Sequence, residues 1–192
     1  MILETSRLLL RPLSVGDAID MYEFAKNPNV AVNAGLAPHK SLKETKRIIR
    51  NFYIPQPYIF GMVLKYSGKL IGTPGLVADP KRKYNRVKML SYAMSEDYWG
   101  HGYMTEACTE LLKFAFQGLK LDLISCYCFP HNIKSQNVIK RLGFLYEGRL
   151  IGCQQDFYGN LLDNDCYALT EERYRNLNRI KALNSQYKKN LL

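Results

Sequence analysis

The stretch Tyr98-Trp-Gly-His-Gly-Tyr-Met-Thr-Glu-Ala107 joins a predicted strand at 87–94 to a predicted helix at 103–116. Gly100 and Gly102 let the backbone turn sharply there and approach a ligand without an intervening side chain. The N-terminus of the helix then offers unpaired N–H groups and a positive dipole end, which suit a pyrophosphate. A dinucleotide-binding motif would need a third glycine, and glycines at such a turn can also be purely structural.

The chain on either side of this turn alternates between strand and helix patterns. Short apolar runs predict strands, at 8–12, 58–65, 70–77, 87–94, 121–129, 144–151 and 165–169. Apolar residues three or four apart predict helices, after the capping residues Ser14 and Ser41, at 103–116, before Gly143 and from Glu171 onward. Hairpins in the middle and strand-helix units later predict an α/β (α+β) fold, a mixed sheet with helices on both faces.

Three of these segments carry special expectations. Pro74 has no backbone donor, so the strand at 70–77 is expected at a sheet edge or a bulge. The near-continuous apolar run at 121–129 is typical of a strand buried on both faces. The terminal helix carries an apolar stripe, expected to pack on the domain or on a partner, at Tyr174, Leu177, Ile180, Leu183, Tyr187 and Leu191.

Composition places the chain among compact globular proteins. Its 192 residues suffice for one domain with one core, and 47% hydrophobic against 23% charged residues is ordinary for such a domain. No apolar run reaches the roughly 20 residues that span a bilayer, and the N-terminus lacks a signal-peptide pattern. Five cysteines, an odd number, favour reduced thiols, so we expect a cytoplasmic protein without a membrane partner.

Two further features suggest ligands. Cys126 and Cys128, followed by His131, could begin a metal site, but no second ligand pair follows, so we predict no metal. The net charge of +10 attracts polyanions such as nucleic acid, ribosomes or a phosphate-rich cofactor. Because the basic residues are dispersed and no arginine-rich tract with aromatics appears, we predict no direct nucleic-acid binding.

The stretch at 98–107 resembles the cofactor-binding motif A of the GNAT superfamily of N-acetyltransferases, in particular its ribosomal-protein N-terminal acetyltransferase (RimJ/RimL-like) branch. The residues that carry the resemblance are Tyr98, Trp99, Gly100, Gly102, Tyr103, Thr105, Glu106 and Ala107. The resemblance implies a GNAT-like, mostly antiparallel sheet and acetyl-CoA as cosubstrate. It also implies that the backbone N–H groups of His101, Gly102, Tyr103, Met104 and Thr105 bind the pyrophosphate, while the strand at Ala93 and Met94 pairs with the pantetheine.

A second stretch, from Asn132 to Phe144, resembles motif B of the same superfamily, and Asn132 would hydrogen-bond the cofactor arm. Many members carry a tyrosine seven residues after this Asn, which protonates the leaving thiolate, whereas this chain has Ile139. Ser135 lies one helical turn earlier on the same side. We therefore predict Ser135 as the thiolate donor or hydrogen-bond partner, with a helix N-terminal cap as an equally weighted alternative.

The implied reaction needs a neutral amine, stabilisation of an oxyanion (by a backbone N–H near Met94) and departure of the thiolate. An α-amine has a pKa of about 7.7–8.0, whereas deprotonating a lysine near 10.4 would cost roughly 4 kcal/mol. The sequence offers only Glu96, Asp163 and Asp165 as candidate bases, and exposed loop carboxylates are more often merely solvated. The favoured acceptor is therefore an N-terminal α-amine, of a ribosomal or another protein.

Two other functions stay open, a small-amine acetyltransferase and a non-catalytic acyl-CoA-binding module. The loops at 31–39 and 153–162 that would shape the acceptor site match nothing specific. The resemblance extends over roughly 5–174, so we predict an acetyltransferase domain at 1–174 and a helical extension at 175–192. The amphipathic extension and an exposed sheet edge are consistent with a homodimer.

Overall fold

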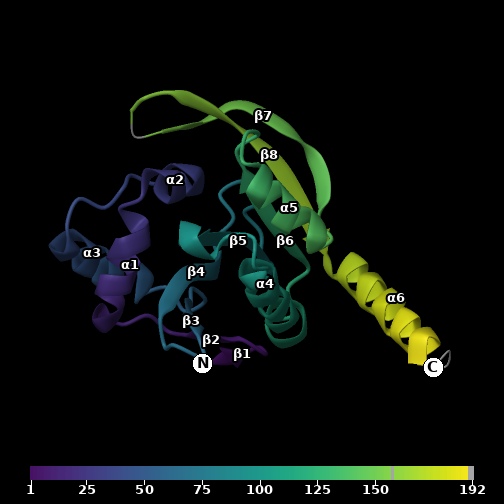
Figure 1. The fold of residues 1–192 in the computed structure, drawn as a ribbon. Coiled ribbons are helices and arrows are strands. Elements are labelled where there is room, and N and C mark those ends of the chain that lie inside the picture. The colour runs from purple at the N-terminus through teal and green to yellow at the C-terminus, as the bar shows by residue number, and fades with distance from the viewer. Residues whose placement is uncertain (157, 190–192) are drawn as a thin grey trace.

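A computed structural model describes residues 1–156 and 158–189 and shows one continuous sheet flanked by helices (Figure 1). The eight strands follow the order β1-β2-β3-β4-β5-β6-β8-β7. Every neighbouring pair is antiparallel except β5 and β6, which are parallel. The predicted fold class, a mixed and mostly antiparallel sheet with helices on both faces, is confirmed.

The strands begin and end close to the predicted positions in the middle of the chain. Their bounds are β1 Leu3–Glu4, β2 Leu8–Arg11, β3 Gly61–Leu64, β4 Leu70–Val77, β5 Val87–Met94, β6 Leu123–Cys128, β7 Leu145–Gln155 and β8 Leu161–Thr170. The last two strands are longer than predicted because they form an extended hairpin whose outer strand, β7, is exposed along most of its length. β1 is too short to show a period in the sequence.

The helices are α1 Ala18–Ala25, α2 Pro28–Ala31, α3 Leu42–Ile48, α4 Tyr103–Lys113, α5 Ile133–Arg141 and α6 Glu171–Lys189. The predicted capping residues act as such, because Ser14 forms a capping box with Asp17 and the Ser41 side chain accepts from the Glu44 N–H. Asn27-Pro28 separates α1 from α2, with the Asn27 side chain capping α2. π-helical turns at Ile49–Tyr53 and Phe114–Gly118 continue α3 and α4.

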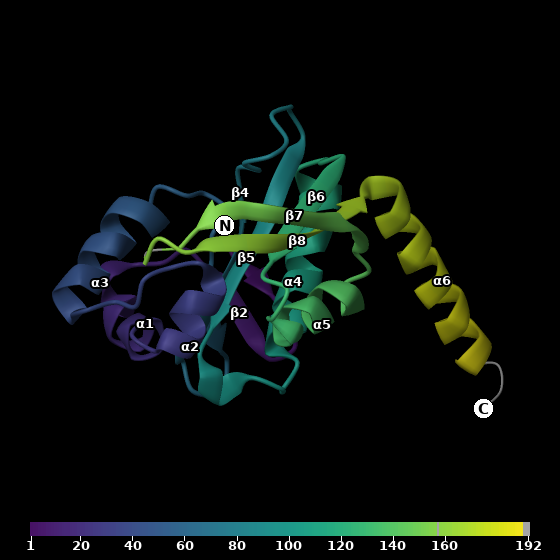
Figure 2. The same ribbon diagram turned by 90° about the horizontal axis from the view of Figure 1, so that it is seen from above.

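The alternation of side chains along the strands directs two apolar clusters to opposite faces of the sheet. Leu8 and Leu10 of β2 belong to the cluster under α4 and α5, whereas Leu9, between them, packs against the cluster under α1 and α3. Figure 2 shows these two groups of helices on either side of the sheet. Burial of both faces therefore fixes the register of the central strands.

Of the two positions expected for Pro74, a sheet edge or a bulge, the structure fits the second. β4 lies between β3 and β5, so the expected edge position is wrong. The ladder between β3 and β4 is irregular, however, with a register shift between Met62 and Val63 and an isolated bridge from Ile59 to Gly75. The Pro74 carbonyl accepts from the Phe60 N–H at 2.9 Å. Because the ladder is irregular here, it does not require the backbone N–H that proline lacks.

The parallel pair β5 and β6 separates after a short contact. Pairing joins Val87, Lys88 and Met89 to Leu123, Ile124 and Ser125, and no pairing between the two strands follows in the described chain. The C-terminal half of β5 thus keeps one open edge, which faces the N-terminal turns of α4 and α5 (Figure 1).

The terminal helix α6 leaves the body of the protein (Figures 1 and 2). Its first turns are attached, because Tyr174 stacks on Phe116 at 4.7 Å between ring centroids and the Arg173 Nε donates to the Gly143 carbonyl at 2.7 Å. Ile180 and Leu183, further along, are exposed. The predicted Leu191 lies outside the described residues, and the division at 174/175 and the homodimer stay predictions. Among the described helices, none is long and apolar enough to cross a membrane.

Candidate active site

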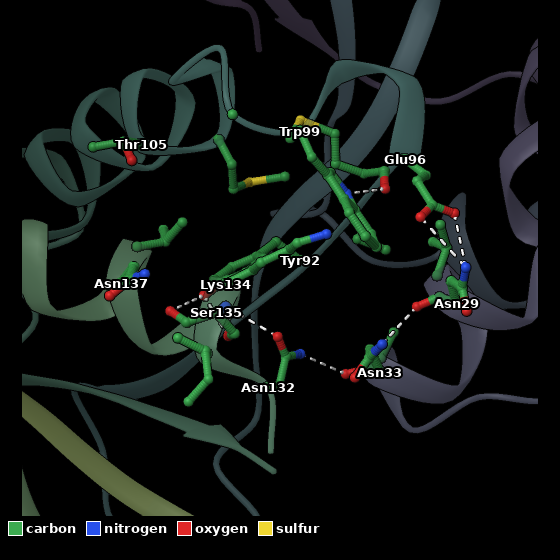
Figure 3. A pocket seen from close by; sticks show the side chains of 18 of the residues that line it. Asn29, Asn33, Tyr92, Glu96, Trp99, Thr105, Asn132, Lys134, Ser135 and Asn137 are labelled. Carbon is green, nitrogen blue, oxygen red and sulfur yellow. Dashed lines mark hydrogen bonds between the residues drawn. The ribbon is translucent and has the colours of Figure 1, made fainter. Parts of the chain in front are cut away.

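The open edge of β5 lines a cavity of about 700 Å³, bounded by α2, the first turn of α4 and the first turns of α5 (Figure 3). The side chains gathered there are amides, hydroxyls, apolar groups and a few charged groups, Arg141 at the end of α5 among them. They include Asn29, Asn33, Tyr92, Ala93, Met94, Glu96, Trp99, Gly100, Gly102, Met104, Thr105, Asn132, Lys134, Ser135 and Asn137. Among the predicted site residues, His101 and Tyr103 do not line this cavity with their side chains.

The turn before α4 has the geometry that the two glycines predict. Gly100 and Gly102 have φ values of 83° and 79°, in the left-handed region that favours glycine. The first helical hydrogen bond runs from the Glu106 N–H to the Gly102 carbonyl, at 3.0 Å. The N–H groups of the three residues between them therefore have no acceptor within the helix. These N–H groups form the positive end of the helix dipole and can bind an anion.

A carboxylate in the first turn of α4 anchors this anion-binding turn to the N-terminal segment. Glu106 accepts from the Thr5 hydroxyl at 2.5 Å, from the Arg7 N–H at 3.0 Å and from the Arg7 Nε at 2.6 Å. Burial alone would raise the pKa of Glu106, but these hydrogen bonds outweigh burial and lower it to about 2. Arg7 also donates to the His101 carbonyl at 3.1 Å and lies over the Tyr103 ring.

Trp99 connects the turn to β5 and to α5. Its Nε1 donates to the Met94 carbonyl at 3.0 Å. The Lys134 ammonium lies over the indole ring, 3.9 Å from its centroid, so the side chain of Lys134 reaches across the cavity from α5 (Figure 3). A cation therefore lies beside the anion-binding turn. Among the described residues it forms no direct ion pair, and its charge helps to lower the pKa of Glu96.

Successive residues of β5 direct their backbone N–H and C=O groups alternately toward β4 and toward the opposite edge of the strand. The Ser95 N–H donates to the Ile71 carbonyl of β4 at 2.8 Å, and in an antiparallel ladder this places the polar groups of Ala93 on the β4 side as well. Tyr92 and Met94 then direct their N–H groups toward the open edge. A strand-like ligand would pair with those two residues, while Ala93 contributes its side chain to the cavity wall.

The structure assigns the helix cap of α5 to Asn132. Its Oδ1 accepts from the Ser135 N–H at 3.0 Å, and its Nδ2 contacts the Asn33 carbonyl at 3.4 Å. The alternative in which Ser135 is the N-terminal cap is therefore wrong. Ser135 lies three residues into the capped turn, and its hydroxyl is free to serve the cavity or another side chain.

The Ser135 hydroxyl has a partner that sequence reasoning missed. Its Oγ lies 2.8 Å from the Tyr92 Oη, and the same phenol lies 3.3 Å from the Ser135 carbonyl. Burial raises the pKa of Tyr92 well above its ordinary value, so the phenol stays protonated at neutral pH. Ile139, at the position where the superfamily often has tyrosine, is completely buried in the core. The sequence shows Tyr92 as one residue with a polar tip in β5. That its hydroxyl meets Ser135 depends on where β5 separates from β6, which the sequence does not show.

The three carboxylates considered as bases lie in different surroundings. Glu96 lines the cavity, and hydrogen bonds from Asn29 and Asn27 lower its pKa. Asp165 is buried against Arg149 at 2.7 Å, and Asp163 accepts from the Gly152 N–H at 2.8 Å. Neither lines the cavity, so they are structural residues of the β7–β8 hairpin. In the described part of the chain no group of three or more His, Cys, Asp or Glu residues is placed to hold a metal.

An anion-binding turn, an open strand edge and a pair of hydroxyls along one cleft suit an extended ligand that carries phosphate groups. The comparisons with known proteins give the family. The acetyltransferase (GNAT) domain matches residues 7–145, and the chain belongs to this family of acetyltransferase enzymes. Acetyl-CoA, the cosubstrate that the GNAT fold implies, fits these residues, and it would supply the acetyl group as an activated thioester.

Individual relatives agree with this assignment. The uncharacterized N-acetyltransferase YoaA of Bacillus subtilis (strain 168) is 28% identical over 178 residues, covering 90% of this chain and 98% of the relative. The crystal structure of a GNAT-family acetyltransferase from Bacillus anthracis superposes with a TM-score of 0.80 at 22% identity, covering 90% and 99% of the two chains. That of a ribosomal-protein-S5-alanine acetyltransferase from Vibrio fischeri gives 0.71 at 20% identity, covering 91% and 98%. The two structures share the fold.

Proposed function

We propose that this acetyltransferase is RimJ/RimL-like and acetylates the α-amine of a protein or peptide N-terminus by direct attack in a ternary complex. The observation that carries the proposal is the state of Glu96. It is the acidic residue of the cavity wall, and amide donors stabilise its charged form. A carboxylate with a lowered pKa is a weak base, which suits an amine that is already partly neutral near pH 7.5.

The walls of the cavity support the same acceptor class. Asn29 and Asn33 of the α2 segment and Asn132 of α5 present amide groups around the opening (Figure 3). Amides pair with peptide N–H and carbonyl groups, and Glu96 adds one negative charge that can hold an ammonium group before it loses its proton. A polycationic small amine would find only this one carboxylate in the wall and a surrounding protein of net charge +10.

Each predicted site residue has a role in this proposal. The N–H groups of residues 101–105 hold the pyrophosphate, with Gly102 allowing its approach. Tyr92 and Met94 pair with the pantetheine, beside the Ala93 side chain, and a backbone N–H of this strand stabilises the oxyanion. Asn132 contacts the cofactor arm, and Ser135 donates a hydrogen bond to the sulfur. The free cysteines suit a reducing compartment, and we place the enzyme in the cytoplasm.

A thiol-release assay with a panel of amines tests the acceptor. The panel holds peptides with free Ala or Ser N-termini, N-terminally blocked peptides with lysine, polyamines and aminoglycosides. We expect acetyl-CoA turnover with the free-N-terminus peptides. Turnover confined to a polyamine or an aminoglycoside would overturn the acceptor assignment and leave the enzyme class in place.

A further inference from the structure

Two hydroxyl groups from opposite walls of the cavity meet where β5 and β6 have separated. Tyr92 comes from the open edge of β5, Ser135 comes from α5, and their oxygen atoms are 2.8 Å apart (Figure 3). Both residues line the cavity. The contact therefore joins the strand that would pair with the cofactor to the helix that would flank it.

The Ser135 hydroxyl also lies within hydrogen-bonding reach of the Cys128 thiol, which is only a weak acceptor. The pair therefore still has one proton to donate to a stronger acceptor such as a thiolate. The phenol has one proton, and both acceptors within its reach, the Oγ and the carbonyl oxygen, belong to Ser135. When the phenol donates to either of them, the Ser135 proton can point into the cavity. The phenol also fixes the position of Oγ, because a serine side chain alone rotates between three staggered positions.

We propose that Tyr92 is the second residue of the site that binds the cofactor sulfur in its thiolate form, beside the Ser135 of the proposed function. Ser135 donates to the sulfur, and Tyr92 is the positioning residue that holds and polarises Ser135. This inference rests on the proposed function for its cosubstrate, and it replaces the single tyrosine that the superfamily often has at the position of Ile139. Ile139 is fully buried and has no polar atom, so it cannot take that role.

The chemistry requires a hydrogen-bond donor here and no net proton source. The amine loses one proton when its nitrogen bonds to the acetyl carbon, and the sulfur gains one after the carbon–sulfur bond breaks and leaves its electron pair on sulfur. The two hydroxyls return unchanged. Hydrogen bonds to an ionised group are about twice as strong as neutral ones, so the site favours the thiolate over the thiol.

The test uses the full-length protein and free CoA, without any acceptor. The thiolate of bound CoA is titrated by its ultraviolet absorbance, after subtraction of the same titration with desulfo-CoA, which lacks the sulfur. We expect the acid dissociation constant of the bound thiol to exceed that of free CoA about tenfold, which corresponds to the net free energy of one hydrogen bond. Tyr92→Phe and Ser135→Ala should lose most of this increase, and Ser135→Thr should retain it.

Tyr167→Phe is the matched control, since Tyr167 is a buried tyrosine of β8 that does not line the cavity. It should leave the acid dissociation constant of the thiol unchanged. CoA affinity at about pH 6, where the thiol is protonated, should change little in all four variants. An unshifted thiol in the wild-type protein, or a shift that survives either Tyr92→Phe or Ser135→Ala, would overturn the inference. A shifted thiol in an enzyme that ignores every free-N-terminus peptide would support it while overturning the proposed acceptor.

Discussion

Glu106 and Arg7 are joined by two hydrogen bonds, one to the backbone N–H of Arg7 at 3.0 Å and one to its Nε at 2.6 Å. Ninety-nine residues separate them in sequence. Because Arg7 also donates to the His101 carbonyl, the N-terminal segment holds both ends of the anion-binding turn. These contacts of Arg7 brace the turn, and the match to the family begins at the same residue, 7.

Removing the brace should weaken cofactor binding. Arg7→Met deletes the side-chain bonds to Glu106 and to the His101 carbonyl and keeps the backbone N–H bond to Glu106. We therefore expect the Kd for CoA to rise about tenfold and the free energy of unfolding to fall by about 1–2 kcal/mol. Isothermal titration calorimetry and chemical denaturation measure the two effects. Lys69→Met is the control, since Lys69 forms a surface ion pair with Glu23 of α1, at 2.8 Å, away from the N-terminal segment and from α4. Equal effects of the two substitutions on CoA binding would contradict this role of Arg7.

The same carboxylate should make stability depend on pH in acid. The pKa of Glu106 in the folded protein is about 2, below the roughly 4.3 of an unfolded chain. Its contribution is therefore fully present above the unfolded value and is lost as the pH falls through about 2. Glu106→Gln should be less stable at pH 7, and the gap to the wild type should narrow between pH 4 and 2. A gap that stays constant over this range would show that Glu106 is not the titrating group.

Gly102 should be needed for the shape of the turn. Its φ of 79° costs a residue with a side chain about 1 kcal/mol, and an added Cβ would have room, with its nearest neighbour the Arg7 side chain at 3.6 Å. Gly68, with φ of 73° in a hairpin turn and open space around it, is the matched control. We expect Gly102→Ala and Gly68→Ala to lower the free energy of unfolding similarly and only Gly102→Ala to raise the Kd for CoA. A normal Kd in Gly102→Ala would remove the turn from the binding site.

Lys134 should add affinity through its charge. Its ammonium lies over Trp99 beside the anion-binding turn, and we expect it to move to the cofactor phosphates on binding. Lys134→Gln should raise the Kd for CoA about tenfold, roughly 1.4 kcal/mol, and reduce the dependence of binding on salt. Lys140→Gln, on the same helix but outside the cavity wall, should leave both unchanged. Equal Kd values for the two variants would contradict this role and leave Lys134 with only its contact to Trp99.

Much of the fold follows from local sequence signals. The capping residues Ser14 and Ser41 and the paired glycines at 100 and 102 act as predicted because each satisfies a requirement of its own turn. The edge position expected for Pro74 is wrong, since whether a strand lies at an edge depends on which segments pair with it, whereas the irregular ladder beside it fits the alternative of a bulge. The register shift between Met62 and Val63 is not written in the sequence near Pro74.

The residues of the candidate site likewise fall into those that the sequence indicates and those that only the structure shows. Gly102, Thr105, Asn132 and Ser135 could be found because they form compact motifs, and the structure brings them to one cavity. Tyr92 and Lys134 could not, because their importance arises from contacts between segments about 40 residues apart, or from a side chain that crosses the cavity. Such contacts depend on the separation of β5 from β6, which no local pattern encodes.

The central claim is that the acceptor is an N-terminal α-amine. The most direct measurement offers the enzyme acetyl-CoA and one peptide with both a free N-terminus and an internal lysine, and locates the added acetyl group by fragmentation mass spectrometry. The account predicts acetyl on the N-terminal residue and none on the lysine, with loss of the product when the N-terminus is blocked. Acetylation of the lysine, in either peptide, would contradict it.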